Sequence, residues 1–446
     1  MAPPAPRVRD ATPQGDAGRL GSGPALGPPT VVPRTVAVIG GGWAGLAAAV
    51  EATRLGHHVT LFEMAPQLGG RARGVAVDGL VLDNGQHILI GAYTATLALM
   101  RAVGVDVDRA LLRTPLRFTS PDGSGLHLEA GAPVLAFARA VIGQRKWSVA
   151  ERAALLTAAT GWALRRFRCR DSLTVAELTA RLPRAIRDQL IDPLCVAALN
   201  TPASDASARV FLRVLKDALF SGPGSADLLL PRESLSELLP TPAQHALATV
   251  RIRLQTRVAS LRSHGDGWLV NDEAFERVVL AASPNESARL AAAIAPAWSQ
   301  CAAALRFEPI VTVYVRGDGV RLPEPMIALH SDAHAPAQFV FDRGQLGGPR
   351  GLLAFVISGA QAWVDRGLEA TTDATLAQAR AALALELHPV HTIAEKRATF
   401  RCTPDLQRPP MHVAPGLMAA GDYADGPYPA TLEGAVRSGM QAAALL

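Results

Sequence analysis

The chain has 446 residues, of which 49% are hydrophobic and 5% aromatic. This length indicates two or three domains with enough apolar side chain for a sizeable core. The 44 basic and 39 acidic residues are spread without a long basic block, which argues against a nucleic-acid-binding function.

Residues 1–33 are rich in Pro, Gly and Ala and lack an apolar h-region, so we expect a disordered extension and not a signal peptide. No stretch reaches about 18 uninterrupted apolar residues, which predicts no transmembrane helix. The four cysteines are far apart, without C-x-x-C or metal-ligand spacing. They suit reduced thiols in a cytoplasmic protein, and we expect no metal site.

A dinucleotide-binding unit is predicted near the start of the chain. The apolar run 36–39 indicates a buried strand, and residues 40–45 fit G-x-G-x-x-G. A helix should begin there and end at Gly56, before a second strand at 59–62 that ends in Glu63. Glu63 can accept hydrogen bonds from ribose hydroxyls, and an acid here argues against a 2′-phosphate.

Each glycine of this motif has a physical role. Gly40 permits the tight turn, Gly42 lets the backbone approach a pyrophosphate, and Gly45 lets the helix pack closely on the strand. The helix start at Trp43 and Ala44 offers free N–H groups to phosphate. The alternative is a plain glycine-rich turn, which the complete strand, helix, strand and acid order makes the weaker interpretation.

Further polar turns follow. Gly70 and Arg71 form a Gly-Gly-Arg turn that suggests a second phosphate contact, although an ordinary loop is the alternative. A hairpin is predicted at 75–82, and it leads to polar residues at 83–87, including Gly85 and His87, beside the presumed cofactor.

The middle of the chain is predicted to be helical from 132 to 190, after a strand pair at 115–128. Its apolar stretch 153–164 is followed by an arginine-rich stretch, 165–170. This pattern fits a helix in a membrane interface and fits a core helix with a charged last turn equally well.

The second half is predicted to hold an α+β substrate domain. Helix 207–220 has an apolar face of Leu, Val and Phe residues, and the segment 228–232 is extended and apolar. Such residues usually belong to the core and less often line a substrate channel. Residues 252–258 alternate like a half-exposed strand, with 268–270 as its return strand. Further strands are expected at 278–282, 310–315 and 352–357, with a helix from about residue 372.

The C-terminus carries a second polar strand end. A strand at 416–420 ends in Gly421 and Asp422, and a final helix is expected to begin at 428–439. Asp422 can accept from sugar hydroxyls, and the helix N-terminus can donate to a flavin carbonyl or phosphate. The alternative is an ordinary turn beside a covering helix.

These motifs resemble the FAD-containing amine oxidase and phytoene desaturase superfamily. More narrowly, the chain is similar from about residue 34 onward to the hydroxysqualene dehydroxylases, also called squalene-associated FAD-dependent desaturases. The narrower resemblance rests on residues 82–87, 193–202, 228–232 and 426–431.

The resemblance implies an α/β fold, a Rossmann-like FAD-binding domain with an inserted α+β substrate domain. FAD-binding segments would span 34–100, 226–298 and 396–446; a helical substrate segment would span 101–225 and a sheet segment 299–395. The implied FAD ligands are, from the ADP half to the flavin ring, Gly40, Gly42, Trp43, Ala44, Gly45, Glu63, Val258, Gly70, Arg71, Gly85, Gly421, Asp422, Thr431 and Leu432.

The implied reaction is reductive removal of a hydroxyl from hydroxysqualene to give squalene. His87 is the first candidate for the acid, and Asn200 would help to hold the hydroxyl. The implied partners are a hydrophobic triterpene, the inner face of the membrane and neighbouring squalene-pathway enzymes. A carotenoid-type desaturase or amine oxidase and a non-catalytic FAD-bound membrane protein are the alternatives.

Overall fold

The structure is a computed structural model that describes residues 32–446. The extension predicted at residues 1–33 therefore lies almost entirely outside the described residues. None of the helices within residues 32–446 combines the length and the apolar composition that crossing a bilayer requires.

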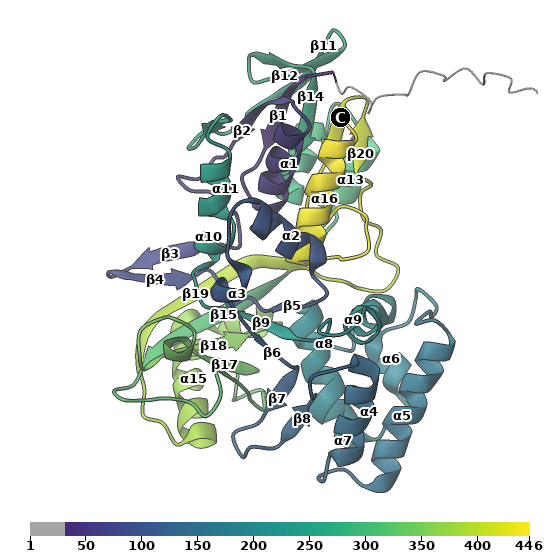
Figure 1. Cartoon of the computed structure of the whole chain (residues 1–446), viewed down its shortest axis with the longest axis vertical. Coiled ribbons are helices and arrows are strands. Elements are labelled where there is room, and N and C mark those ends of the chain that lie inside the picture. Colours follow the sequence, from purple (N-terminus) through teal and green to yellow (C-terminus); the bar gives the residue numbers. More distant parts are fainter. Residues whose placement is uncertain (1–31) are drawn as a thin grey trace, which may run out of the picture. The chain divides into compact units, whose positions relative to one another are not determined.

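A six-stranded sheet in the order β10-β2-β1-β14-β21-β20 carries the N-terminal motif (Figure 1). All neighbours are parallel except β21 and β20. Widely separated segments thus share one sheet, as the resemblance implied, whereas the exact domain boundaries stay a prediction. The strands are β1 (Thr35–Ile39), β2 (His58–Phe62), β10 (Arg251–Arg253), β14 (Arg277–Leu280), β20 (His412–Ala414) and β21 (Leu417–Ala419).

The predicted strand–helix–strand unit is confirmed as β1, α1 (Trp43–Arg54) and β2. Helix α1 lies beside the C-terminal helix α16 (Leu432–Ala444), which begins four residues later than the expected start at 428 (Figure 1). The two backbones approach closely, because a Cβ on Gly439 would lie 2.1 Å from the carbonyl oxygen of Ala44. A side chain at residue 439 would force the two helices apart.

A second, five-stranded antiparallel sheet has the order β16-β17-β18-β15-β19. It confirms the strands predicted at 310–315 and 352–357. One of its faces packs against helix α15 (Leu368–Leu383), which starts before the expected residue 372. The strands are β15 (Phe307–Arg316), β16 (Met326–Ala328), β17 (Phe339–Asp342), β18 (Leu352–Ile357) and β19 (His388–Phe400).

The predicted helical region forms its own apolar core. It consists of α4 (Pro133–Gly143), α5 (Val149–Leu164), α6 (Val175–Thr179), α7 (Arg184–Ile186), the π-helical turn η1 (Arg187–Ile191), α8 (Asp192–Leu199) and α9 (Ala208–Phe220). Three small sheets adjoin it or the five-stranded sheet: β3 (Gly74–Val77) with β4 (Leu80–Asp83), β7 (Arg117–Thr119) with β8 (Gly125–His127), and β5 (Leu89–Ile90) with β9 (Leu228–Pro231) and β6 (Leu111–Thr114).

The predicted pairing of residues 252–258 with 268–270 is wrong. Strand β10 ends at Arg253, and Gln255 has a left-handed φ of 52°, which interrupts the extended backbone. The partner of β12 (Gly267–Val270) is instead β11 (Leu261–His264), and β13 (Glu273–Phe275) completes that sheet. The alternation in the sequence continues past the end of β10 into residues 254–258, which form no strand.

The remaining helices are short connections. They are α2 (Thr94–Ala102), α3 (Val107–Ala110), α10 (Leu235–Leu238), α11 (Pro240–Ala246), α12 (Pro284–Ala291), α13 (Pro296–Ala303), the 3-10 turn η2 (Arg343–Gln345) and α14 (Gln361–Arg366).

The close α1–α16 contact predicts that a Gly→Ala substitution destabilises the fold at residue 439 and stabilises it at residue 161, where there is room for a methyl group. Gly439→Ala should destabilise the fold by about 1–3 kcal/mol, because the added methyl group overpacks the α1–α16 contact. Gly161→Ala is the matched control: it lies within α5, where the nearest atom to a Cβ is the end of Arg165 at 3.5 Å. In this control the free energy of unfolding should rise by about 0.5–1 kcal/mol, because Ala loses less conformational freedom than Gly when the helix forms. Thermal unfolding of both variants measures the difference, and equal shifts would contradict the proposed packing.

Candidate functional site

The first part of the site is the turn between β1 and α1. Gly40 has φ 113°, and a Cβ on Gly45 would lie 1.8 Å from the Gly40 carbonyl oxygen. Gly42 differs, because its Cβ would meet only the Cα of Gly70, at 3.8 Å. Helix α1 begins without a side-chain cap or an acidic first turn, so the N–H groups of Trp43 and Ala44 are available to an anion.

The second glycine turn packs directly on the first. The Gly69 N–H donates to the Gly41 carbonyl oxygen at 2.8 Å, and Gly42 and Gly69 form an isolated parallel bridge. Gly70 has φ 60°, a backbone conformation that residues with a side chain rarely adopt. The two turns together form one edge of a cavity of about 530 Å³.

Glu63 lies at the end of β2 and lines this cavity, as predicted. Its carboxylate accepts from the N–H groups of Gly41 and Ala65, each at 2.7 Å. These bonds hold the acid against the glycine turn, and the remaining lone pairs of the carboxylate can still accept from ribose hydroxyls. Val258 also lines the cavity, beside Arg257 and Ser283.

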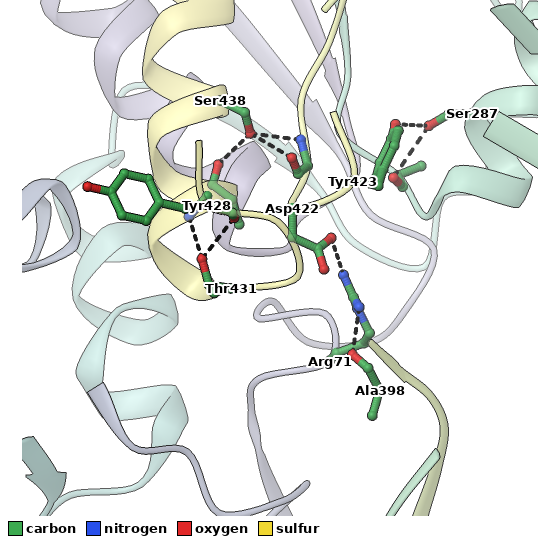
Figure 2. Close-up of polar contacts among 12 residues, drawn as sticks. Arg71, Ser287, Ala398, Asp422, Tyr423, Tyr428, Thr431 and Ser438 are labelled. Atoms are coloured by element: carbon green, nitrogen blue, oxygen red, sulfur yellow. Dashed lines mark hydrogen bonds and ion pairs between the residues drawn. The ribbon is translucent and has the colours of Figure 1, made fainter. Parts of the chain in front are cut away.

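An ion pair joins the N-terminal and C-terminal parts of the site. Arg71 donates from Nη2 to Asp422 at 2.6 Å and from Nη1 to the Ala398 carbonyl at 2.7 Å (Figure 2). The Asp422 side chain is only 8% exposed, so it depends on this partner for compensation of its charge. Asp422 and Arg71 thus position each other, and the ribityl and pyrophosphate contacts expected of them stay predictions.

The start of α16 forms another edge of the cavity. Thr431 caps the helix by accepting from the Gly434 N–H at 3.0 Å, and its hydroxyl donates to the Tyr428 carbonyl at 3.0 Å (Figure 2). Thr431 and Leu432 both line the cavity. The first N–H groups of α16 have no acceptor within the helix, which gives this edge a partial positive charge.

Sequence reasoning missed Ser438, which fixes the turn after β21. Its hydroxyl accepts from the Gly421 N–H at 2.9 Å and donates to the Gly421 carbonyl at 3.0 Å (Figure 2). Asn84 was predicted only as part of a polar turn, yet it donates to the Arg71 carbonyl and to Glu395, each at 3.0 Å. No local sequence pattern marks the roles of Ser438 and Asn84, because their partner residues lie 13 or more positions away in the sequence.

The loop with Gly85 and His87 lies at the cavity wall, as predicted. Burial, and then the positive charge of Arg71, lowers the pKa of His87 to about 4. The imidazole is therefore neutral at pH 7, with about one molecule in a thousand protonated.

A buried network holds this loop from behind. Gln86 donates to the Tyr314 hydroxyl at 2.9 Å, and that hydroxyl donates to the Asp83 carbonyl at 2.9 Å. Arg343 reaches Gln86 at 3.2 Å and the Asp83 carboxylate at 3.8 Å. Burial raises the pKa of Asp83 to about 6, while the Leu235 N–H and Arg343 oppose the shift.

Asn200 lines the cavity but its amide is engaged elsewhere. It donates to the Glu308 carbonyl at 3.1 Å and to Thr399 at 3.0 Å, and it accepts from the Gly359 N–H at 2.7 Å. Its φ of 48° ends helix α8. This geometry favours a structural role, and the predicted contact of Asn200 with a substrate hydroxyl gains no support from it.

A second cavity of about 440 Å³ lies between the helical region and the start of α16, and its walls are almost entirely apolar. It shares lining residues with the first cavity, so the two adjoin: Ile88, Tyr93, Ala197, Ala198, Phe339 and Thr431. Leu155, Leu156 and Trp162 of α5 line it. One face of the stretch 153–164 therefore lines this cavity. Contact of the stretch with a membrane stays a prediction.

A family model described as flavin containing amine oxidoreductase matches residues 43–446. The chain belongs to this family. It is an FAD-dependent oxidoreductase, and its cofactor is FAD. The two glycine turns, the Gly42 backbone that faces the cavity and the uncapped N-terminus of α1 suit a dinucleotide, and the start of α16 lines the same cavity.

Two curated relatives are named hydroxysqualene dehydroxylase. The protein of Sinorhizobium fredii is 27% identical over 93% of this chain and 98% of its own length. The protein of Rhodopseudomonas palustris is 28% identical, also over 93% of this chain and 98% of its own length. The chain is thus similar to these proteins along almost its whole length.

Solved structures have the same amine oxidase-like fold. An oxidoreductase from Methanosarcina mazei superposes with a TM-score of 0.70 at 16% identity, covering 91% of this chain and 99% of its own. Cyclohexylamine oxidase from Brevibacterium oxydans gives a TM-score of 0.66 at 17% identity, covering 93% and 98%. At these identities the likeness establishes the fold and no substrate.

Proposed function

We propose that the chain removes the hydroxyl group of hydroxysqualene reductively to give squalene. The observation that carries this proposal is the apolar cavity of about 440 Å³ that adjoins the cofactor cavity. Its volume falls within the usual range of small-molecule sites. Most of its lining residues are apolar, and the charged residues in its wall, Arg213 and Asp217, pair with each other at 2.7 Å. A mostly apolar wall suits a long hydrocarbon chain better than a charged amine. The names of the relatives from Sinorhizobium fredii and Rhodopseudomonas palustris support the same substrate.

The proposed reaction breaks one C–O bond and forms one C–H bond. The hydroxyl leaves with a proton as water, and the allylic carbon that carried it accepts a hydride. Reduced FAD supplies that hydride when it is bound. The apolar walls, with residues such as Phe339 and Leu228, exclude water that would otherwise return to the allylic cation.

Product analysis tests this function directly. Reduced holoprotein, incubated without oxygen, should convert hydroxysqualene to squalene and leave oxidised flavin. Parallel incubations of the oxidised holoprotein with phytoene and with putrescine test the desaturase and amine oxidase alternatives. Flavin reduction by either of these compounds, without squalene formation in the first experiment, would replace the proposed function.

The proton donor has a pH signature. Because the pKa of His87 lies near 4, lowering the pH from 7 to 5 increases the imidazolium population about tenfold per unit. If His87 delivers the proton, single-turnover rates should rise with that slope, and His87→Gln should remove the slope while FAD stays bound. A wild-type rate that is flat over this range would exclude His87 as the donor.

We also propose that an anionic membrane surface supplies the substrate. Val134 and Phe220 line the apolar cavity and are also exposed, by 42% and 49%, so they mark its mouth. Phe167 contacts Phe220 with ring centroids 5.0 Å apart, and Leu164, one turn earlier, is 81% exposed. An apolar mouth of this kind can lie in the headgroup region of a bilayer.

Charge at the mouth supports the same partner. The arginines at residues 165, 166, 168 and 170 are exposed, and within residues 32–446 none of them has an ion-pair partner. Unpaired cations next to exposed apolar side chains complement anionic headgroups, at about 1 kcal/mol per residue. The apolar cavity would then receive a lipid-soluble substrate without its passage through water.

Vesicle sedimentation tests this contact. The wild-type chain should bind phosphatidylglycerol vesicles and release them at high salt, because the attraction is screened. A variant with Arg165→Glu, Arg166→Glu and Arg168→Glu should lose binding but retain turnover of detergent-solubilised hydroxysqualene. Equal charge reversal at the exposed residues Arg109, Arg251 and Arg262 serves as the control. Similar loss of binding in both variants would show that net charge, and not the mouth, attracts the vesicles.

A further inference from the structure

The two faces of strand β15 have different surroundings. Val311, Val313 and Val315 belong to the apolar cluster that includes residues of α15. Ile310 and Tyr314 belong to the cluster on the other face of the sheet. Because side chains alternate along a strand, Thr312 shares the face of Ile310 and Tyr314. Thr312 and Ile310 both line the cofactor cavity, so this face of the sheet forms a wall of that cavity.

Thr312 is the one polar member of a row that crosses four strands. It pairs with Val356 of β18 and with Ile393 of β19, and Val356 pairs in turn with Phe339 of β17. All four side chains line the cofactor cavity, and Phe339 also lines the apolar cavity. Since neighbouring strands are about 4.8 Å apart, Thr312 lies about 10 Å from the residue where the two cavities meet.

The hydroxyl of Thr312 has no hydrogen-bond partner within the described chain. The residue is 1% exposed, and Oγ1 is one of the few buried side-chain atoms in residues 32–446 that remain unpaired. Because Oγ1 itself has almost no accessible surface, it can meet a ligand in the cavity only after χ1 turns to another staggered position. The nearby hydroxyl of Tyr314, by contrast, is fully engaged with Gln86 and Asp83. A buried hydroxyl without a partner destabilises the fold, so such a group calls for an interaction that the bound state supplies.

We propose that Thr312 binds the hydroxyl group of the substrate. This inference rests on the proposed function and names a residue that recognises the alcohol. The glycine turns and the start of α16 provide the polar groups predicted for FAD, whereas Thr312 belongs to the sheet wall among apolar side chains. An alcohol both donates and accepts a hydrogen bond, as threonine does, and a hydrocarbon product does neither. Thr312 therefore favours the substrate over squalene.

The test compares binding of the alcohol and of the hydrocarbon to the oxidised holoprotein, followed by the flavin absorbance change. Thr312→Val keeps the shape and removes the hydroxyl. It should weaken hydroxysqualene binding by about five- to fifty-fold, as expected for loss of one hydrogen bond to a substrate, and change squalene binding less than about twofold. Thr312→Ser, which retains the hydroxyl, should restore most of the affinity for the alcohol.

A matched variant on the same sheet separates binding from stability. Thr392 faces the other side and hydrogen-bonds Thr372 at 2.7 Å. Thr392→Val should lower the melting temperature and leave the preference for the alcohol unchanged. Thr312→Val should keep or raise the melting temperature, because it removes an unpaired buried hydroxyl.

Two results would overturn the inference while the proposed function stands. One is unchanged hydroxysqualene binding by Thr312→Val, and the other is an equal loss of both ligands, which would indicate a role in shape alone. Failure of the wild-type chain to bind or convert hydroxysqualene is a different outcome, and it would remove the proposed function together with this inference.

Discussion

The cofactor site depends on backbone-to-backbone packing that only glycine allows. A Cβ on Gly45 would collide with the Gly40 carbonyl, and one on Gly40 would lie 2.5 Å from the carbonyl of Ala281, the residue after strand β14. The same rule holds at Gly439, where α16 meets α1. These contacts bring the N-termini of both helices to one cavity, beside the Gly69–Gly70 turn. Residues from both ends of the chain thereby form a single site for a long, negatively charged cofactor.

Local motifs made much of this arrangement predictable. The β1–α1–β2 unit, the Gly-Gly-Arg turn and Asp422 each have a short sequence pattern with a physical cause, and all line one cavity. Long-range partners have no such pattern. The pairing of Arg71 with Asp422 and of Asn200 with Gly359 joins residues separated by 351 and 159 positions. The short strand β10 was misjudged because its alternation continues into a segment where Gln255 turns the backbone.

The two adjoining cavities divide the chemistry between them. Charged and backbone polar groups surround the cofactor cavity, where burial, and then the charge of Arg71, lowers the pKa of His87 and keeps its imidazole neutral. Mostly Leu, Phe and Ala side chains surround the other cavity, with the Arg213–Asp217 pair in its wall. Its mouth carries exposed apolar residues beside arginines that have no ion-pair partner in residues 32–446. In the proposed reaction the hydrocarbon occupies the apolar cavity and its hydroxyl extends toward the sheet wall. Selectivity then arises from a few polar groups within a dry environment.

The central claim is that a hydride from reduced FAD replaces the hydroxyl of hydroxysqualene. A single turnover in D₂O tests it most directly, because the transferable hydrogen of the reduced flavin exchanges with solvent. Anaerobically reduced holoprotein mixed with hydroxysqualene should give one equivalent of oxidised flavin. It should also give squalene with one deuterium at the carbon that carried the hydroxyl. Unlabelled squalene, or flavin that stays reduced while hydroxysqualene is recovered unchanged, would contradict the claim.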